Sequence, residues 1–207
     1  MEILSKVLIS TKIRIMGRSN LAYKSQSVTA EEYLKLERNS KRKHEFFDGE
    51  IVAMAGASLK HNIISSNLQG ELFSQLKGSP CRPFASDLRV KAKRNYFYPD
   101  IVVSCQDRKF EDDSDDTLLN PRIIIEILSK STKLTDRNLK FDSYLSIETL
   151  TDYILVEQNS MRVEHYQRNK DVWNVVVLSN PSDKLFLNSI NCELNLAEIY
   201  NEVKLSK

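Results

Sequence analysis

Two short apolar segments, each carrying one carboxylate, constrain this chain more than any other feature. Residues 99–103 contain Asp100, and residues 122–129 contain Glu126. Segments this apolar are typical of buried strands. An ionised carboxylate on a buried strand is costly unless it is paired, hydrogen-bonded or bound to a cation. A divalent metal ion shared by the two carboxylates would remove this cost.

Each carboxylate also has a simpler interpretation. Asp100 follows a proline and can cap a strand, and Glu126 can pair with an arginine such as Arg89 or Arg122. For either residue alone, such a structural role is the more common one. Two carboxylates on consecutive apolar segments favour a shared site instead.

A basic residue follows the second segment. Residues 136–144 predict a helix that begins near Thr135 and has Lys140 about one turn inside it. A helix that follows a strand can return its first turn toward the end of that strand. Lys140 is therefore a candidate cation beside the two carboxylates.

The pattern of these segments resembles a known protein family. It is similar to the bacterial family of putative restriction-endonuclease domains within the PD-(D/E)xK nuclease superfamily, from about Val28 to about Tyr200. The likeness is carried by Tyr98 to Val102, Ile124 to Thr132 and Asp136 to Phe141, and also by His44 to Val52, Ser58 with His61, Ser86 to Val90 and Asp152 to Val156.

The resemblance implies a metal-dependent endonuclease that hydrolyses DNA phosphodiester bonds. Asp100 and Glu126 would be ligands of Mg²⁺, for which Mn²⁺ can substitute, and the main-chain oxygen of Ile127 would complete the coordination. Asp87 is a candidate third carboxylate, and its pairing with Arg89 or Arg94 across a hairpin is the alternative.

The sequence departs from the family's motif at one position. The lysine expected two residues after Glu126 is Leu128. We expect Lys140 to replace it, so that Asp100, Glu126 and Lys140 form the catalytic set, although Lys140 can also be an ordinary surface lysine. Arg137 is the alternative cation, but a guanidinium stays protonated and can only stabilise charge.

Two further residues are candidates for a supporting role. Glu45 lies just before a predicted turn at Asp48 and Gly49, and His61 lies in the first turn of a predicted helix. A histidine at that position is more often a helix-terminal polar residue than a ligand.

The predicted elements favour an α/β (α+β) fold, with a restriction-endonuclease-like mixed β-sheet flanked by helices and extra hairpins. Thr29 and Glu32 form the pattern of a capping box. The predicted helices span 29–39, 58–77, 135–144 and 194–203; the predicted strands span 46–54 as a hairpin, 82–85, 86–92, 96–104, 122–129, 153–156, and 161–167 with 172–178 as a second hairpin.

The length of 207 residues suits one substantial core. We expect residues 1–27 to be an N-terminal extension of unknown role and residues 28–207 to be a single PD-(D/E)xK nuclease-like domain. Formal net charge is only +2, and residues 1–27 contain five basic residues and one acidic residue, so the rest of the chain is net negative. Any DNA-binding surface must therefore be a local patch.

Cysteine spacing and hydropathy bear on location. Cys81, Cys105 and Cys192 are far apart and lack a C-x-x-C spacing, which predicts neither a disulfide nor a zinc site and favours a reducing cytoplasm. No apolar run approaches the length of a membrane span, so no membrane partner is expected. A homodimer is expected because cleavage of both strands of a duplex usually takes two sites.

Two other functions compete with the nuclease. The first is a catalytically degenerate nuclease fold that binds a partner or nucleic acid, which Leu128 and the near-neutral net charge favour. The second is a two-carboxylate glycosidase, for which the single tryptophan, Trp173, offers little sugar-stacking surface.

Overall fold

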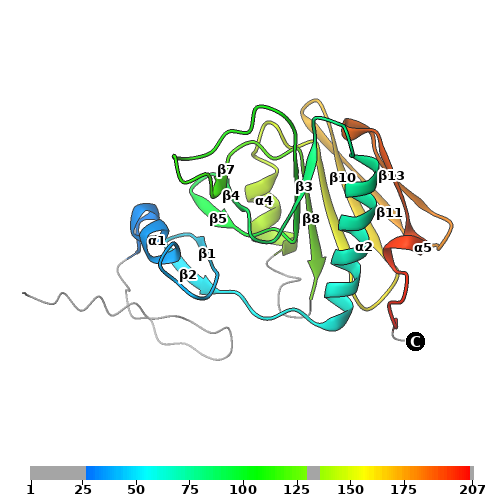
Figure 1. Ribbon diagram of the computed structural model, residues 1–207, viewed down its shortest axis with the longest axis horizontal. Helices are drawn as coiled ribbons and strands as arrows, with labels where there is room; N and C mark the ends of the chain where they lie inside the picture. The colour runs from blue at the N-terminus through cyan, green and yellow to red at the C-terminus, as the bar shows by residue number, and fades with distance from the viewer. Residues whose placement is uncertain (1–26, 130–135, 206–207) are drawn as a thin grey trace, which may run out of the picture. The chain divides into compact units, whose positions relative to one another are not determined.

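The computed structural model describes residues 27–129 and 136–205 (Figure 1). The chain divides into two units, residues 1–55 and 56–207, which are described separately. The predicted N-terminal extension, apart from residue 27, and the predicted helix start near Thr135 lie outside the described residues. That residues 28–207 form one domain stays a prediction.

The first unit begins with helix α1 (Ala30–Glu37). Its capping box is confirmed, because the Thr29 N–H donates to Glu32 Oε2 at 2.8 Å and the Glu32 N–H donates to Thr29 Oγ1 at 3.2 Å. These two bonds satisfy donors that a helix N-terminus otherwise leaves free.

A hairpin completes this unit. Strands β1 (His44–Phe47) and β2 (Glu50–Ala53) pair antiparallel around the predicted turn, where Asp48 and Gly49 both have positive φ. Glycine and aspartate tolerate that backbone conformation better than most residues. The predicted hairpin is confirmed.

The second unit is built on a six-stranded mixed sheet, in the order β11-β10-β9-β8-β6-β3. Only β8 and β9 are parallel, and the other neighbours are antiparallel. The predicted α+β class with a mixed sheet is confirmed. The strands are β3 (Arg82–Ala85), β6 (Ile101–Ser104), β8 (Ile123–Leu128), β9 (Asp152–Glu157), β10 (Val163–Asn169) and β11 (Val172–Leu178).

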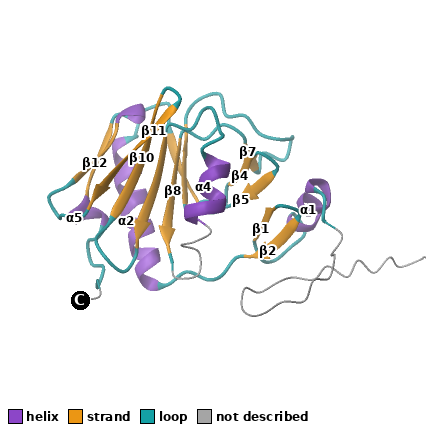
Figure 2. Cartoon of the chain, turned by 180° about the vertical axis from the view of Figure 1, so that it is seen from behind, coloured by secondary structure: helices purple, strands orange, loops and turns teal. Residues whose placement is uncertain are grey.

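One face of this sheet is covered by helix α2 (Leu59–Gln75), which lies in front of the sheet in Figure 1 and behind it in Figure 2. Alternate residues of β8 point to this face, and Ile123, Ile125 and Ile127 join α2 in the main apolar core. The helix contributes Ile64, Leu68 and Leu72 to that core, and its C-cap residue Leu76 continues the series. Their spacing of four residues places them on one side of the helix.

A second hairpin and a short helix extend this cover. Strand β12 (Lys184–Leu187) pairs with β13 (Cys192–Asn195), and α5 (Leu196–Ile199) follows. The prediction of one helix over 194–203 is therefore wrong at its start and too long. Leu194 contributes to the core from a strand, because its pairing with Leu185 decides its conformation.

The opposite face carries a π-helical turn, η1 (Asp136–Lys140), and the short helix α4 (Phe141–Tyr144). Phe141 packs edge-on against Tyr153 of β9 and Tyr166 of β10, with ring centroids 6.0 and 4.8 Å apart. Glu126 has its side chain on this face, one residue out of phase with the β8 isoleucines that meet α2.

Two predicted strands in this unit are interrupted. Residues 86–88 form a turn before β4 (Arg89–Ala92), and the predicted strand 96–104 divides into β5 (Asn95–Phe97) and β6. β4 pairs with β5 and, in parallel, with β7 (Thr117–Leu118), which lies in the long connection between β6 and β8. The buried guanidinium of Arg89 pairs with Asp116 at 2.8 Å and thereby anchors that connection.

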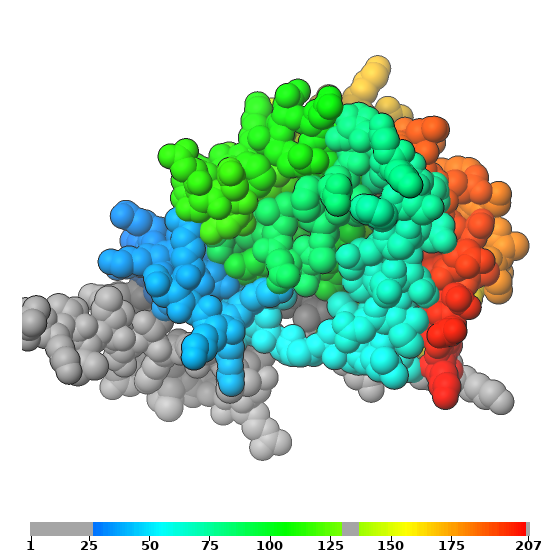
Figure 3. Space-filling view, in the orientation of Figure 1, coloured from blue at the N-terminus to red at the C-terminus, as the bar shows by residue number. Residues whose placement is uncertain are grey.

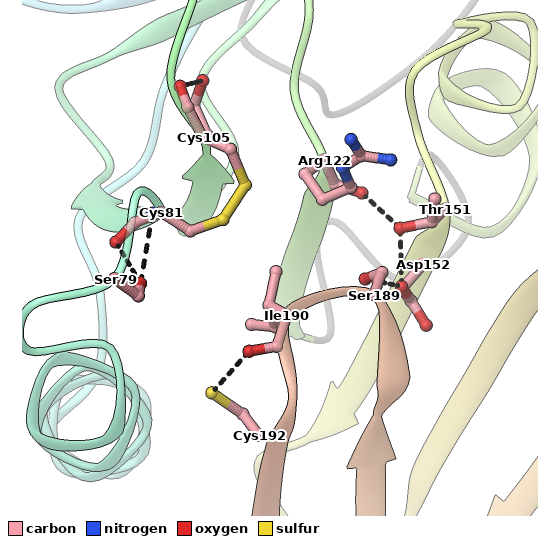
Figure 4. The surroundings of a disulfide bond; sticks show 10 residues. Ser79, Cys81, Cys105, Arg122, Thr151, Asp152, Ser189, Ile190 and Cys192 are labelled. Carbon is pink, nitrogen blue, oxygen red and sulfur yellow. Dashed lines mark hydrogen bonds between the residues drawn. A yellow bond between two sulfur atoms is a disulfide. The ribbon is translucent and has the colours of Figure 1, made fainter.

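The prediction that the cysteines are unpaired is wrong, because Cys81 and Cys105 form a disulfide (Figure 4). Strand β3 pairs antiparallel with β6, with Arg82 opposite Ser104, so the two cysteines follow as the next opposed pair. This proximity is invisible in the sequence because 24 positions separate the cysteines. The argument for a reducing compartment loses its basis. Cys192 is free and buried.

No helix in the described parts of the chain combines the length and the apolar composition that crossing a bilayer requires.

A buried polar network lies at the start of β9 (Figure 4). Asp152 is fully buried, with Oδ1 2.7 Å from His165 Nε2, and Oδ2 accepts hydrogen bonds from Thr151 at 2.7 Å and Ser189 at 2.8 Å. Burial raises the pKa of the Asp152 carboxyl, but the hydrogen bonds from these three residues outweigh burial and the net pKa is lowered.

We expect Asp152→Asn to lower the free energy of unfolding at neutral pH by about 2 kcal/mol, because a buried, multiply hydrogen-bonded carboxylate is lost. A lowered folded-state pKa stabilises the protein above the unfolded pKa, near 3.8, and this stability is lost as pH falls through the folded pKa. Between pH 7 and pH 3, the free energy of unfolding measured with urea should therefore fall less in Asp152→Asn than in the parent. Exposed Asp171→Asn is the control, and equal pH dependence in Asp152→Asn and the parent would contradict the expectation.

Candidate active site

The pairing of two strands brings Asp100 and Glu126 together. β6 and β8 are antiparallel with Ile101 opposite Ile125, so Asp100 and Glu126 are the next opposed pair. Directly opposite residues point to the same face of a sheet. The Asp100 N–H lies 3.4 Å from Glu126 Oε2, and the Ile127 N–H donates to Asp100 Oδ2 at 2.6 Å.

The Glu126 carboxylate is almost fully buried, with 3% of the residue exposed. Its Oε1 atom lies 3.3 Å from Lys140 Nζ and accepts a hydrogen bond from the Tyr144 hydroxyl at 3.1 Å. Lys140 is also buried, and its ammonium lies 5.7 Å from the centroid of the Phe97 ring. A buried carboxylate requires such compensation, because transfer of a charge out of water is costly.

The π-helical turn places Lys140 at this carboxylate. Lys140 is the last residue of η1, and Tyr144 lies four positions later at the end of α4. Residues four apart project from the same side of a helix, so both reach Glu126. Single π-helical turns are frequent at functional sites. Sequence reasoning missed Tyr144, although its spacing from Lys140 was a usable signal.

His61 lies in the first turn of α2, with Nε2 3.1 Å from Asp100 Oδ2. The helix begins at Ser58, whose hydroxyl accepts a hydrogen bond from the His61 N–H at 3.2 Å. His61 Nδ1 is buried and has no hydrogen-bond partner among the described residues. The histidine ring is therefore held against Asp100 through one nitrogen.

A buried glutamine joins the start of α2 to the end of β8. The Ser58 hydroxyl donates to Gln158 Oε1 at 2.5 Å, and Gln158 Nε2 donates to the carbonyl oxygen of Leu128 at 3.1 Å. This bridge fixes the helix that carries His61 relative to the strand that carries Glu126. No pattern in the sequence indicates it, because Gln158 simply follows a buried strand.

Asp87 and Glu45 lie on other elements of the chain. Asp87 is exposed in the turn between β3 and β4, not on a strand as predicted, because residues 86–88 leave the ladder. Glu45 lies in β1 of the first unit and is buried there.

Arg137 is engaged with carboxylates on neighbouring strands. Its guanidinium lies 2.6 Å from Glu164 of β10 and 3.1 Å from Glu157 of β9. Burial lowers the pKa of Arg137, but the two glutamates outweigh burial and raise the pKa above its ordinary value. Arg137 therefore ties η1 to the ends of two strands.

The donor set suits a hard, oxygen-preferring cation. Within residues 27–129 and 136–205, no three or more His, Cys, Asp or Glu side chains form a metal-binding group. Mg²⁺ is commonly held by one or two carboxylates, with waters and substrate phosphate as the other ligands. Asp100 Oδ1 makes no hydrogen bond to another described residue, so it is available as a ligand beside Glu126. The residues fit Mg²⁺ in an open, two-carboxylate site.

Comparisons with known proteins place the chain in a family. Residues 30–197 match the family Uma2, described as "Putative restriction endonuclease". This chain belongs to the Uma2 family. The match spans α1 to α5, so it includes every residue of the candidate site.

Two relatives of this Uma2 chain come from Synechocystis sp. (strain ATCC 27184 / PCC 6803 / Kazusa). Uncharacterized protein sll1609 is 40% identical over 146 residues, which are 70% of this chain and 82% of the relative. Uncharacterized protein slr1290 is 36% identical over 177 residues, which are 84% of this chain and 91% of the relative.

A crystal structure has the same fold as this Uma2 chain. It is described as a putative nuclease belonging to DUF820 from Anabaena variabilis ATCC 29413. The TM-score is 0.71 at 22% identity, and the alignment covers 84% of this chain and 97% of the other. At this identity the likeness establishes the fold and leaves the chemistry to the site itself.

We expect Tyr144→Phe to lower the free energy of unfolding by about 1–2 kcal/mol, because the buried Glu126 carboxylate loses one of its donors. Urea denaturation measures the loss in the parent and in a Glu126→Ala background. The loss of unfolding free energy caused by Tyr144→Phe should be smaller in the Glu126→Ala background, because the carboxylate that accepts the Tyr144 hydrogen bond is absent there. Equal costs in both would show that the hydroxyl does not act through Glu126.

Proposed function

We propose that this chain is a metal-dependent endonuclease that hydrolyses DNA phosphodiester bonds. The proposal rests chiefly on one arrangement: two carboxylates, Asp100 and Glu126, occupy opposed positions of adjacent strands, and Lys140 Nζ lies 3.3 Å from Glu126 Oε1. Two acidic ligands and one amine are the groups that this hydrolysis needs. The Uma2 description supports the same class of reaction.

In this proposal Asp100 and Glu126 hold Mg²⁺, or Mn²⁺ in its place, and the main-chain oxygen of Ile127 is a further candidate ligand. The bound cation would neutralise charge on the scissile phosphate and make water more acidic. The Ile127 N–H supports the site differently, because its hydrogen bond at 2.6 Å orients the Asp100 carboxylate.

In this proposal Lys140 replaces the motif lysine that is missing at position 128. Leu128 occupies that lysine's position, and its hydrocarbon side chain has no group that can orient or deprotonate water. Lys140 orients the attacking water or accepts its proton. Arg137 is less suitable, because two glutamates already engage its guanidinium and it remains protonated.

His61 acts as a positioning residue in this proposal. Its Nε2 atom lies 3.1 Å from Asp100 Oδ2 and limits the rotation of that carboxylate. Asp87 and Glu45 stay as candidates without an assigned step. DNA is the proposed substrate, and a homodimer would present two sites to the two strands of a duplex.

A second candidate function is a catalytically degenerate nuclease fold that binds a partner or nucleic acid. Two observations favour it: Leu128 occupies the position of the motif lysine, and Lys140 already forms a buried ion pair with Glu126. Such a protein has no need to bind a divalent cation. Metal binding and DNA cleavage together separate the two functions.

We expect Asp100→Ala to abolish Mg²⁺-dependent cleavage of plasmid DNA and to weaken Mn²⁺ binding measured by calorimetry, because one of two ligands is removed. Circular dichroism checks that the variant is folded. Lys184→Ala, an exposed lysine paired with Glu193, is purified identically and should cleave like the parent. Equal cleavage by Asp100→Ala and the parent would assign the activity to a contaminant, and a folded parent that binds no Mn²⁺ would favour the degenerate function.

We expect Lys140→Ala to lower the cleavage rate by a factor on the order of 10² or more, with a much smaller change in Mn²⁺ or DNA affinity, as loss of a general base or charge stabiliser should. Lys140→Arg, which keeps a charge but cannot accept a proton, distinguishes the two roles. Single-turnover kinetics at saturating metal isolate the chemical step. A parent-like rate in folded Lys140→Ala would contradict the role.

A further inference from the structure

Strand β11 forms an uncovered edge of the six-stranded sheet. Within the described chain it pairs only with β10. Its valines are unusually exposed: Val172, Val175, Val176 and Val177 have 62%, 53%, 54% and 45% of their surface accessible. In Figure 3 the orange part of the chain, which includes β11, reaches the surface at the right of the view.

This edge lacks the features that normally prevent strand pairing. Exposed edges are usually short, bulged, or interrupted by charged residues or proline. β11 has seven residues without charge or proline, and all seven pair with β10 in an unbroken register. The opposite edge, β3, is shorter and carries Arg82 and Pro83. The two edges of the sheet therefore differ in their protection.

We propose that β11 is a docking surface for β11 of a second copy of this chain. The two strands pair antiparallel about a two-fold axis at Val175 and join the two six-stranded sheets. Val172 then lies opposite Leu178 of the second copy, and Trp173 lies opposite Val177. The proposal is independent of the proposed nuclease function.

The chemistry of the strand favours a second copy as the occupant. A two-fold interface must be self-complementary, because each residue of the patch meets the same patch. β11 has no charged side chain, so pairing with itself brings no like charges together. The nearest charged residues at the start of the strand, Lys170 and Asp171, lie in the turn that joins β10 to β11, outside the paired segment.

The register follows from the length and faces of the strand. Only an axis at Val175 pairs all seven residues. It also opposes residues that share a face: Val172, Asn174, Val176 and Leu178 alternate with Trp173, Val175 and Val177, so valines of both copies adjoin on each face. The strand is about 24 Å long, and an interface of this size predicts reversible, concentration-dependent association.

Sedimentation velocity over a wide range of protein concentration tests this surface. The full-length parent should shift from monomer to dimer as concentration rises, whereas Val175→Lys should stay monomeric because two lysines would meet at the axis. Phe73→Lys is the matched control: Phe73 is 52% exposed on α2 and contacts Arg82 of β3, the opposite edge strand, so its variant should dimerise like the parent. Circular dichroism establishes that each variant is folded.

Cysteine substitution tests the register. Directly opposed strand residues have Cα atoms about 4.5–5.5 Å apart, within the range that a disulfide bridges. Under mild oxidation Val175→Cys should form a covalent dimer, whereas Val172→Cys should not, because it faces Leu178 of the second copy. The parent, whose free Cys192 is buried, shows how much covalent dimer forms without an added cysteine. The proposal is overturned if the parent stays monomeric, if Phe73→Lys disrupts the dimer as Val175→Lys does, or if both cysteines cross-link equally.

Discussion

The buried ion pair between Glu126 and Lys140 is the constraint on which the site depends. A carboxylate with 3% exposure in the middle of an apolar strand needs a donor for its oxygens, and the chain supplies Lys140 and Tyr144 from one helical surface. The π-helical turn and α4 bring these two donors to the carboxylate. The site is therefore built by compensating one buried charge.

The two faces of the sheet differ: one packs against α2 in the apolar core, and the other carries Glu126. The odd-numbered residues of β8 pack into an apolar core with α2. Glu126 points to the other face, and the first turn of α2 contributes His61 at the end of the sheet. The same helix thus contributes Ile64 and Leu68 to the core and contacts Asp100 through His61. Rigid elements hold such groups more accurately than loops do.

Much of this could be predicted from the sequence, because its signals are local. The capping box at Thr29, the turn at Asp48 and Gly49, and the mixed α+β class follow from short-range patterns, and the structure bears them out. Asp100 and Glu126 were visible as charges in apolar segments, and Lys140 as a basic residue about one turn inside the helix that follows. Family membership agrees with the residues that suggested it, whereas the roles of the site residues stay proposals.

Other features were decided only by the tertiary structure, because they join residues distant in sequence. The register of β3 on β6 pairs Cys81 with Cys105, and the pairing of β12 with β13 replaces part of an expected helix. Gln158 links two elements that no local pattern connects. By itself the sequence determined which segments are buried and where charges interrupt them. Strand register, a long-range property set by packing, decided which of those charges meet.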